Sequence, residues 1–262
     1  MSAGPGLSPR SGRIRLPLIT LASFGVVLAL WLWWSAHPTS NGFPPTPGRS
    51  VGRVLWEARR GQLWADLGAS TSRILIGFVI SAVMALPLGL VAGRTKVGQA
   101  AIVPFTEFVR YMPVTAFLAF SIILFGLDEG QKWFLIWMGT FWQLVLMVAD
   151  DAKRVPNELV DAGRTMGLSD AAILRRIVLR AAAPKLWDSH RLALGWAWTW
   201  VVLAEQVNPK HGLGYAIDLG RKFNAYDKIL GYLLVLGVVG LVTDQVLRMV
   251  GRRLFQHEQL AR

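Results

Sequence analysis

Two long runs without a charged side chain, residues 16–36 and 74–93, restrict the possible folds of this chain more than any other feature. A helix needs roughly 20 apolar residues to cross the hydrocarbon core of a bilayer. Runs of that length are too long for one core helix of a soluble domain. The composition agrees, because 53% of the residues are hydrophobic and only 17% are charged. The sequence therefore predicts an all-α membrane protein.

Four more apolar runs, shorter or bounded by charges, add expected membrane helices at residues 111–127, 133–149, 192–204 and 229–243. Together with the first two runs they predict about six transmembrane helices. Pro87 with Gly89 and Gly93, and Pro104 with Pro113, are expected to kink or interrupt the second and third, because proline lacks an amide hydrogen and clashes with the preceding turn. Such a break is tolerated where neighbouring helices or a water-lined cavity satisfy the backbone.

The run at 16–36 has a second possible interpretation as a secretory signal, because Arg10, Arg13 and Arg15 precede it. The apolar part of a signal is usually about 7–15 residues long. This run is longer and ends at a tryptophan pair, a residue type that prefers the membrane–water interface. A retained membrane anchor is therefore favoured.

The placement of lysine and arginine beside the spans predicts the orientation. With the N-terminus in the cytoplasm, 16 of these residues lie on the cytoplasmic side and 10 on the outer side, so we expect both termini in the cytoplasm. A short amphipathic helix at 51–61 could lie on the outer membrane surface. The expected regions are a cytoplasmic tail (1–15), the first membrane helix (16–36), an external loop (37–70), a helical core (71–255) and a second cytoplasmic tail (256–262).

The longest expected cytoplasmic connection, residues 151–185, carries helix signals rather than features of disorder. Pro156 suits the first turn of a helix, and Glu158 places negative charge near the helix N-terminus. Gly167 suits the position just past the helix, where a left-handed backbone favours glycine. One apolar stripe follows the helical period: Leu159, Ala162, Gly163 and Met166.

A second helix is expected after this turn, because Ser169 can cap it, and it extends through Leu179. A helix, a glycine turn and a second helix also describe a DNA-binding helix-turn-helix. That motif usually needs a third supporting helix and freedom to reach DNA, whereas both flanks of this segment return to the membrane. A docking helix for a protein partner is therefore favoured, and no nucleic-acid partner is expected.

The same segment resembles the EAA loop of permease subunits of ATP-binding-cassette importers, whose pattern is Glu-Ala-Ala, three residues, Gly, nine residues, then Ile-x-Leu-Pro. The spacing is kept at Asp161, Ala162, Gly163, Gly167, Ile177 and Leu179. Asp161 stands for glutamate, Gly163 for alanine, and Arg180 for the proline, which Pro184 could partly replace.

Other stretches look similar to the nitrate, sulfonate, taurine and bicarbonate branch of these permeases. They are Arg73 to Gly93 with its ending ALPLGLVAG, FGLDEGQKWFLI at 125–136 and AEQVNPKHGLGYAI at 204–217. The resemblance covers roughly residues 60–255. It implies a type I importer permease of a bacterial inner membrane that moves a small anion-type solute, with 71–255 as the permease core.

The resemblance also implies the partners: a cytoplasmic ATP-binding subunit, a second permease subunit that makes a homodimer, an extracytoplasmic solute-binding protein and the membrane lipid. In such a machine the ATP-binding subunits drive the switch between inward and outward access. The residues implied to couple to them are Glu158, Leu159, Asp161, Ala162, Gly163, Met166 and Gly167.

No sequence motif of catalysis is present in the chain. It has no G-x-x-x-x-G-K-[ST] phosphate loop, no G-x-S-x-G and no H-E-x-x-H, and its four histidines lack metal-ligand spacing. We therefore expect no enzyme activity, cofactor or metal in this chain, and expect the ATP chemistry in a partner. An ATP-independent secondary transporter or channel is the alternative function.

Charges inside expected spans are costly and are therefore functional candidates. Glu107 and Arg110 lie three residues apart on one helix face, where they could line the translocation pathway or neutralise each other. Arg110 is the first candidate for a group that faces an anion. Glu205 could line the pathway or bond to another helix, and the second role is favoured. Asp244 and Arg248 are expected to form an ion pair.

Overall fold

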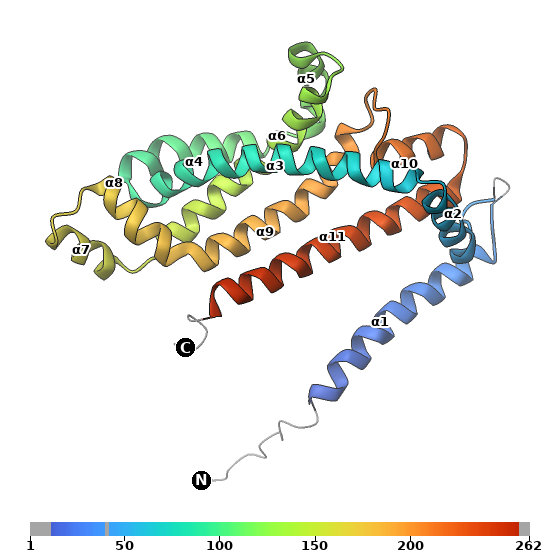
Figure 1. Cartoon of the computed structure of the whole chain (residues 1–262), viewed down its shortest axis with the longest axis horizontal. Helices are drawn as coiled ribbons and strands as arrows, with labels where there is room; N and C mark the ends of the chain where they lie inside the picture. Colours follow the sequence, from blue (N-terminus) through green and yellow to red (C-terminus); the bar gives the residue numbers. More distant parts are fainter. Residues whose placement is uncertain (1–11, 40–41, 257–262) are drawn as a thin grey trace, which may run out of the picture.

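The computed structural model describes residues 12–39 and 42–256, without the side chains of residues 12–17 and 20. Residues 1–11 and 257–262 of the two expected tails lie outside the described residues. The described part of the chain is helical and contains no strand (Figure 1). Its elements are α1 (Gly12–Ser35), α2 (Pro47–Arg59), α3 (Gln62–Arg94), α4 (Lys96–Arg110), the 3-10 turn η1 (Val114–Ala116), α5 (Phe117–Phe125), α6 (Glu129–Lys153), α7 (Asn157–Thr165), α8 (Asp170–Ile173), the π-helical turn η2 (Leu174–Val178), α9 (Leu179–Ala204), α10 (Leu213–Lys222) and α11 (Tyr226–Leu254).

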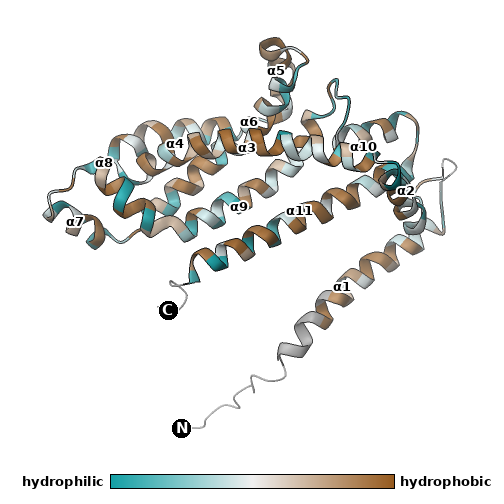
Figure 2. Cartoon of the chain, viewed as in Figure 1, coloured by the Kyte–Doolittle hydropathy of each residue, from teal (hydrophilic) through white to brown (hydrophobic). Residues whose placement is uncertain are grey.

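The long helices α3, α6, α9 and α11 form the body of the molecule, and α1 leaves it at an angle (Figure 1). Helices α7 and α8 lie at one end of this body, which we call the loop end. Helices α2 and α10 lie at the opposite end, which we call the network end. Apolar residues dominate the long helices, whereas polar residues gather at the two ends (Figure 2). This distribution matches a body that crosses a bilayer and has its two ends in water.

Three of the described helices, α3, α6 and α11, are long and apolar enough to cross a membrane. Helices α4 and α5 make a fourth span if they count as one broken helix bent by 77°. Helix α9 has 26 residues and is therefore about 39 Å long, although its first half carries charged side chains. In α1, the apolar segment whose side chains are all described runs from Leu21 to Ser35.

One expected span is wrong in its bounds. Residues 111–127 do not form one helix, because α4 ends at Arg110 and the chain turns at Met112 and Pro113 before α5 begins. The expected interruption at Pro113 is confirmed, whereas α3 and α4 continue through Pro87 and Pro104 without interruption. The four other expected core runs lie inside single helices, namely α3, α6, α9 and α11.

The closest packing in the body is between α3 and α6, and small residues at every fourth position of α3 make it possible. They are Gly77, Ser81, Ala85, Gly89 and Gly93. A Cβ atom at Gly77 would lie 2.8 Å from Cβ of Ile136, and one at Gly93 would lie 2.3 Å from the carbonyl oxygen of Ala149. Small residues at this spacing let helix backbones approach closely in membranes, where packing rather than burial from water drives association.

Replacing Gly89 by alanine is expected to destabilise the protein by about 1–3 kcal/mol, the usual cost of overpacking. Its new Cβ would lie 2.5 Å from Cβ of Val148 and 2.8 Å from a backbone oxygen. Gly68 lies on the same helix with open space around it, so Gly68→Ala is expected to stabilise by roughly 0.5–1 kcal/mol. Unfolding in detergent against SDS concentration measures both variants, and equal effects would contradict the packing account.

Helix α2 confirms the expected helix near 51–61 but begins earlier, at Pro47. Thr46 accepts a hydrogen bond from the amide of Arg49 at 3.4 Å and so caps it, and proline suits the first turn. One face of this helix is covered by protein, because Ser50 and Glu57 are buried where α2 packs on α11. Its position on the membrane surface remains a prediction.

Candidate functional site

The docking helix predicted from the loop sequence is α7, which projects at the loop end (Figure 1). Its apolar stripe is largely uncovered, because Leu159 is 45% exposed, Met166 is 77% exposed and Ala162 is also exposed. Gly163, the fourth member of the stripe, is buried against the chain's own second helix. The exposed apolar surface of α7 and its C-cap therefore consists of Leu159, Ala162 and Met166, which we call the α7 stripe.

The opposite face of α7 fixes the helix to the body. Val160 is buried and packs in the same core cluster as Val155 and Ile173. Arg94, at the end of α3, donates to the backbone oxygen of Val155 at 3.1 Å and to Oδ1 of Asn157 at 3.3 Å. The α7 stripe is thus presented by a helix that is held from behind.

Gly163, which stands where the EAA pattern has alanine, lies against the second helix of the loop. A Cβ atom at this position would lie 2.4 Å from Cδ1 of Ile177. The isoleucine side chain occupies the space that an alanine at 163 would need, and it brings the two helices of the loop into contact. The glycine and the isoleucine are therefore two parts of one packing arrangement.

The turn after α7 confirms the expected role of Gly167. Its φ is +75°, in the left-handed region that favours glycine. Its amide donates to Arg164 O at 2.9 Å, and the amide of Leu168 donates to Gly163 O at 3.1 Å. These two bonds form a Schellman motif, which satisfies the last free carbonyls of the helix.

The second helix of the loop begins as predicted but continues much further. Ser169 accepts a hydrogen bond from the amide of Ala172 at 3.3 Å and caps α8. The expected end at Leu179 is wrong, because α8 passes through the π-helical turn η2 directly into α9, which ends at Ala204. The helix also passes through Arg180 and Pro184. The helix is therefore not interrupted at Arg180, where the EAA pattern has its proline.

The charged residues of α7 lie toward solvent. Glu158 is exposed in the first turn, near the positive end of the helix dipole. Asp161 and Arg164 form an exposed ion pair at 3.1 Å, a type of contact that contributes little to stability. Both carboxylates are therefore available to a partner beside the α7 stripe.

Arg110 lies at a cavity of about 490 Å³ formed where the end of α4 meets α6 and α9. Its guanidinium donates to the hydroxyl of Tyr111 at 3.0 Å and lies 3.5 Å from Oε1 of Gln143. Trp142, Trp196 and Trp200 also line the cavity. One cation among amide and indole groups can hold a small anion that has an organic part.

Glu107 and Arg110 do not form the ion pair that their spacing allowed, and Glu107 is exposed with no salt bridge among the described residues. The expected pair Asp244–Arg248 is confirmed at 3.3 Å. Asp244 also pairs with Arg191 of α9. Asp244 therefore joins α9 to α11 and also forms an ion pair within α11.

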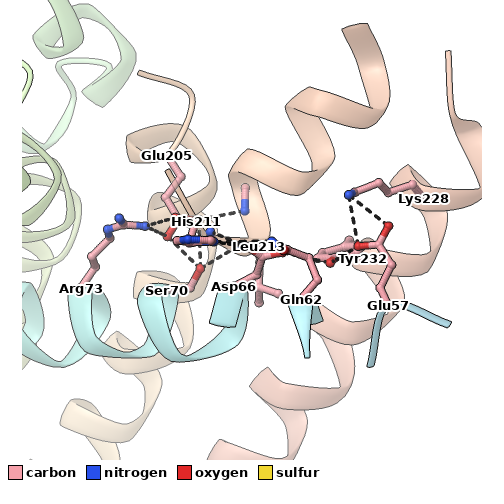
Figure 3. A network of polar contacts seen from close by, with 12 residues as sticks. Glu57, Gln62, Asp66, Ser70, Arg73, Glu205, His211, Leu213, Lys228 and Tyr232 are labelled. Carbon is pink, nitrogen blue, oxygen red and sulfur yellow. Dashed lines mark hydrogen bonds and ion pairs between the residues drawn. The ribbon is translucent and has the colours of Figure 1, made fainter. Parts of the chain in front are cut away.

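Glu205, 0% exposed, lies at the centre of a buried polar network at the network end (Figure 3). Arg73 donates to it at 2.8 Å, and the amide of Gly214 donates at 2.8 Å. The hydroxyl of Ser70 lies 2.7 and 2.9 Å from its two oxygens. Arg73 also binds both oxygens of Glu129, at 2.6 and 2.8 Å. These contacts favour the structural role of Glu205 and tie α3, α6, the end of α9 and the start of α10 together.

A second part of this network joins α2 and α3 to α11 (Figure 3). The hydroxyl of Tyr232 lies 2.7 Å from Glu57 and 3.0 Å from Asp66. Glu57 also pairs with Lys228 at 3.1 Å, and Asp66 accepts from the amide of Gly212 at 3.0 Å. Buried carboxylates are stable only with such partners, so this end of the molecule is cross-linked by charge.

Sequence reasoning missed several residues that hold these sites. Glu57 and Asp66 lie in the stretch 37–70 that is expected to be an external loop, and Arg73 lies just past it in α3. Each has a partner more than 100 residues away in the chain. Val160 could have been found, because it is an apolar residue opposite the stripe in α7; Arg94 carries no local signal of its contact with the loop.

The described part of the chain is thus a body of close-packed long helices with an anchored helix that presents an apolar stripe at one end. The sequence profile of the binding-protein-dependent transport system inner membrane component family matches residues 85–256. This is well over half of the chain, and the chain belongs to that family of ABC importer permeases.

Individual proteins agree with the family match. A probable ABC transporter permease protein of Brucella abortus (strain 2308) is 31% identical over 243 residues, which cover 93% of this chain and 96% of that protein. The taurine transport system permease protein of Escherichia coli (strain K12) is 27% identical over 254 residues, which cover 94% of this chain and 90% of that protein. The fold is similar to that of a chain in the inward-facing MetNI methionine ABC transporter, with a TM-score of 0.61 and 19% identity over 77% of this chain and 97% of that chain.

Proposed function

We propose that this chain is the transmembrane permease subunit of an ATP-driven importer for a small anionic solute of the sulfonate, taurine, nitrate or bicarbonate class. Its partners in this proposal are a cytoplasmic ATP-binding subunit, a second permease subunit and an extracytoplasmic solute-binding protein. The observation that carries the proposal is the exposed α7 stripe on a helix anchored from behind. The relatives, one of them a taurine permease, support the class of solute.

The proposed orientation places the loop end in the cytoplasm and the network end outside. The basis is the excess of lysine and arginine in the segments expected on the cytoplasmic side. In Figure 1, α1 runs toward the network end and α11 runs from the network end back toward the loop end. Both termini are then cytoplasmic, and α7 meets the ATP-binding subunit.

The residues proposed to contact the ATP-binding subunit have different roles at this interface. Leu159, Ala162 and Met166 supply apolar contact, as helix-in-groove recognition requires. Glu158 and Asp161 supply charge at the rim, where it sets orientation and specificity more than affinity. Gly163 and Gly167 shape the helix and its turn.

Arg110 is the proposed anion-facing residue of the translocation pathway. A guanidinium matches the oxygens of a sulfonate, nitrate or bicarbonate group in a forked geometry. The cavity beside it, of about 490 Å³, lies within the usual range for small-molecule sites. Glu107 lies on the same helix and is the second exposed candidate for a pathway residue. Glu205 is proposed only to hold the outer end of the pathway together through its buried contacts.

Replacing Arg110 by glutamine is expected to lower solute uptake by roughly 10-fold to 100-fold, because a hydrogen bond to a charged group contributes about 1.5–3 kcal/mol. Arg110→Lys is expected to retain part of the activity, since it keeps the charge and loses the fork. Uptake of isotopically labelled taurine, ethanesulfonate, nitrate and bicarbonate into cells measures the effect. Arg59→Gln removes an exposed arginine of α2 as a control, and equal losses in both variants would contradict a role for Arg110.

The proposed function itself is tested by energy dependence. In cells that produce the full chain with its co-purifying ATP-binding subunit, uptake is expected to stop when ATP is depleted while the ion gradients are maintained. Uptake that persists under these conditions identifies the alternative, a secondary transporter or channel. Detergent-solubilised chain is also expected to retain a stoichiometric ATPase.

A further inference from the structure

Two cavities meet on one side of the body, between α9 and α11 near the loop end. The smaller, of about 260 Å³, is lined by Arg191, Arg248 and Arg252. The larger, of about 550 Å³, is almost wholly apolar and extends along α3. Both are lined by Trp187, Arg191 and Phe255, so they form one continuous site with a basic end and an apolar end.

The apolar cavity has the length of one leaflet. It is lined on α3 by Leu75, Phe78, Val79 and Leu86. The 11 positions between its first and last residue correspond to about 16 Å along a helix. Half of a hydrocarbon core of about 30 Å is nearly the same length. An acyl chain that starts at the basic end therefore fits along α3 to the middle of the bilayer.

The basic cavity carries more positive than negative charge. Arg191 pairs with Asp244 and, at 3.5 Å, with Asp188, yet its Nε atom is buried and has no hydrogen-bond partner among the described residues. Arg248 shares Asp244 and remains 45% exposed. Arg252 is exposed and makes no ion pair in the described part of the chain. Three guanidinium groups thus face two carboxylates, which leaves room for an anionic oxygen.

An aromatic pair marks the junction of the two cavities. The indole nitrogen of Trp187 donates to Leu247 O at 2.9 Å, and its ring lies over Gly251, where a Cβ would come within 2.5 Å. Phe255 lies against it with ring centroids 6.5 Å apart. Tryptophan at the level of the headgroups is typical of membrane interfaces, so the junction lies at the depth where a lipid headgroup meets its acyl chains.

We propose that this paired site binds one anionic phospholipid, with its phosphate among Arg191, Arg248 and Arg252 and one acyl chain in the apolar cavity against α3. The proposal needs no transported solute and no ATP-binding subunit. It rests on the proposed orientation only for the leaflet, which is the cytoplasmic one. Basic pockets between membrane helices on that side are suited to anionic headgroups.

The test is lipid binding to the purified full chain in detergent, titrated with dioleoyl-phosphatidylglycerol or dioleoyl-phosphatidylcholine and followed by native mass spectrometry. Phosphatidylglycerol is expected to bind in preference. Arg252→Gln is expected to lower its apparent affinity by about fivefold, the factor that corresponds to about 1 kcal/mol for one arginine near an anionic headgroup. Arg176→Gln, which removes an exposed arginine outside the site, is expected to leave the affinity unchanged.

A second pair of variants tests the apolar cavity. Val79 and Val83 are both exposed on α3, but only Val79 lines the cavity. Val79→Trp is therefore expected to abolish the preference for phosphatidylglycerol, and Val83→Trp to preserve it. Three results would overturn the proposal: equal binding of the two lipids, competition by inorganic phosphate alone, or a Val79→Trp variant that alters only the oligomeric state. The last would assign the cavity to a second copy of the chain.

Discussion

Glu205→Ala is expected to lower the free energy of unfolding by about 3–5 kcal/mol, the cost of removing one partner from a buried ion pair. The carboxylate is fully buried, and its loss leaves the amide of Gly214 and one bond of Arg73 unsatisfied. Arg73 retains Glu129, so the helices stay assembled but with a weaker joint at the network end. The SDS concentration at half unfolding in detergent measures the loss.

Glu107→Ala provides the matched control for this prediction. It removes the same carboxylate from a position that is exposed and makes no salt bridge among the described residues. Its unfolding midpoint is expected to stay close to that of the unsubstituted protein. If Glu205→Ala unfolds at that same midpoint, the network does not stabilise the fold.

Charging the α7 stripe with Leu159→Glu and Met166→Glu together is expected to stop ATP-driven uptake without unfolding the protein. Both side chains are exposed and belong to neither buried core cluster, so the body loses no core contact. Residues at the centre of an interface commonly contribute about 2 kcal/mol or more each, and binding of the ATP-binding subunit should weaken at least about 30-fold. Co-purification of that subunit and labelled uptake are the two measurements.

The control for this variant is Gln99→Glu, which adds a charge on α4 at the same end of the molecule. Binding and uptake are expected to remain normal in it. A stripe variant that still binds the ATP-binding subunit and transports at the normal rate would remove α7 from the coupling interface.

Local sequence signals predicted the turn between α7 and α8 well. Gly167 and Ser169 act within five residues of themselves, through a left-handed turn and a cap, so their neighbours alone determine the outcome. The end expected at Leu179 was wrong because it was predicted from adjacent residues alone. Whether a helix continues through η2 depends on packing of Val178 and Ile173 in the core, which adjacent residues do not encode.

The polar residues were harder to predict, because their partners are remote in the chain. Glu205 carried a signal, since a carboxylate next to a membrane span needs a partner. Nothing in the sequence pointed to Arg73, which lies 132 positions earlier. Glu57 looked like part of a surface helix, and only the packing of α2 on α11 turns it inward. Patterns of hydropathy therefore predict which helices exist, and long-range pairing decides which charges they bury.

The unbroken passage from α8 through α9 has a mechanical consequence. Helix α9, about 39 Å long, connects the π-helical turn η2 with Glu205. Pivoted near its loop end, it would carry its far end by about 7 Å for a tilt of only about 10°. Such leverage turns a small displacement at the loop end into a larger movement at the network end.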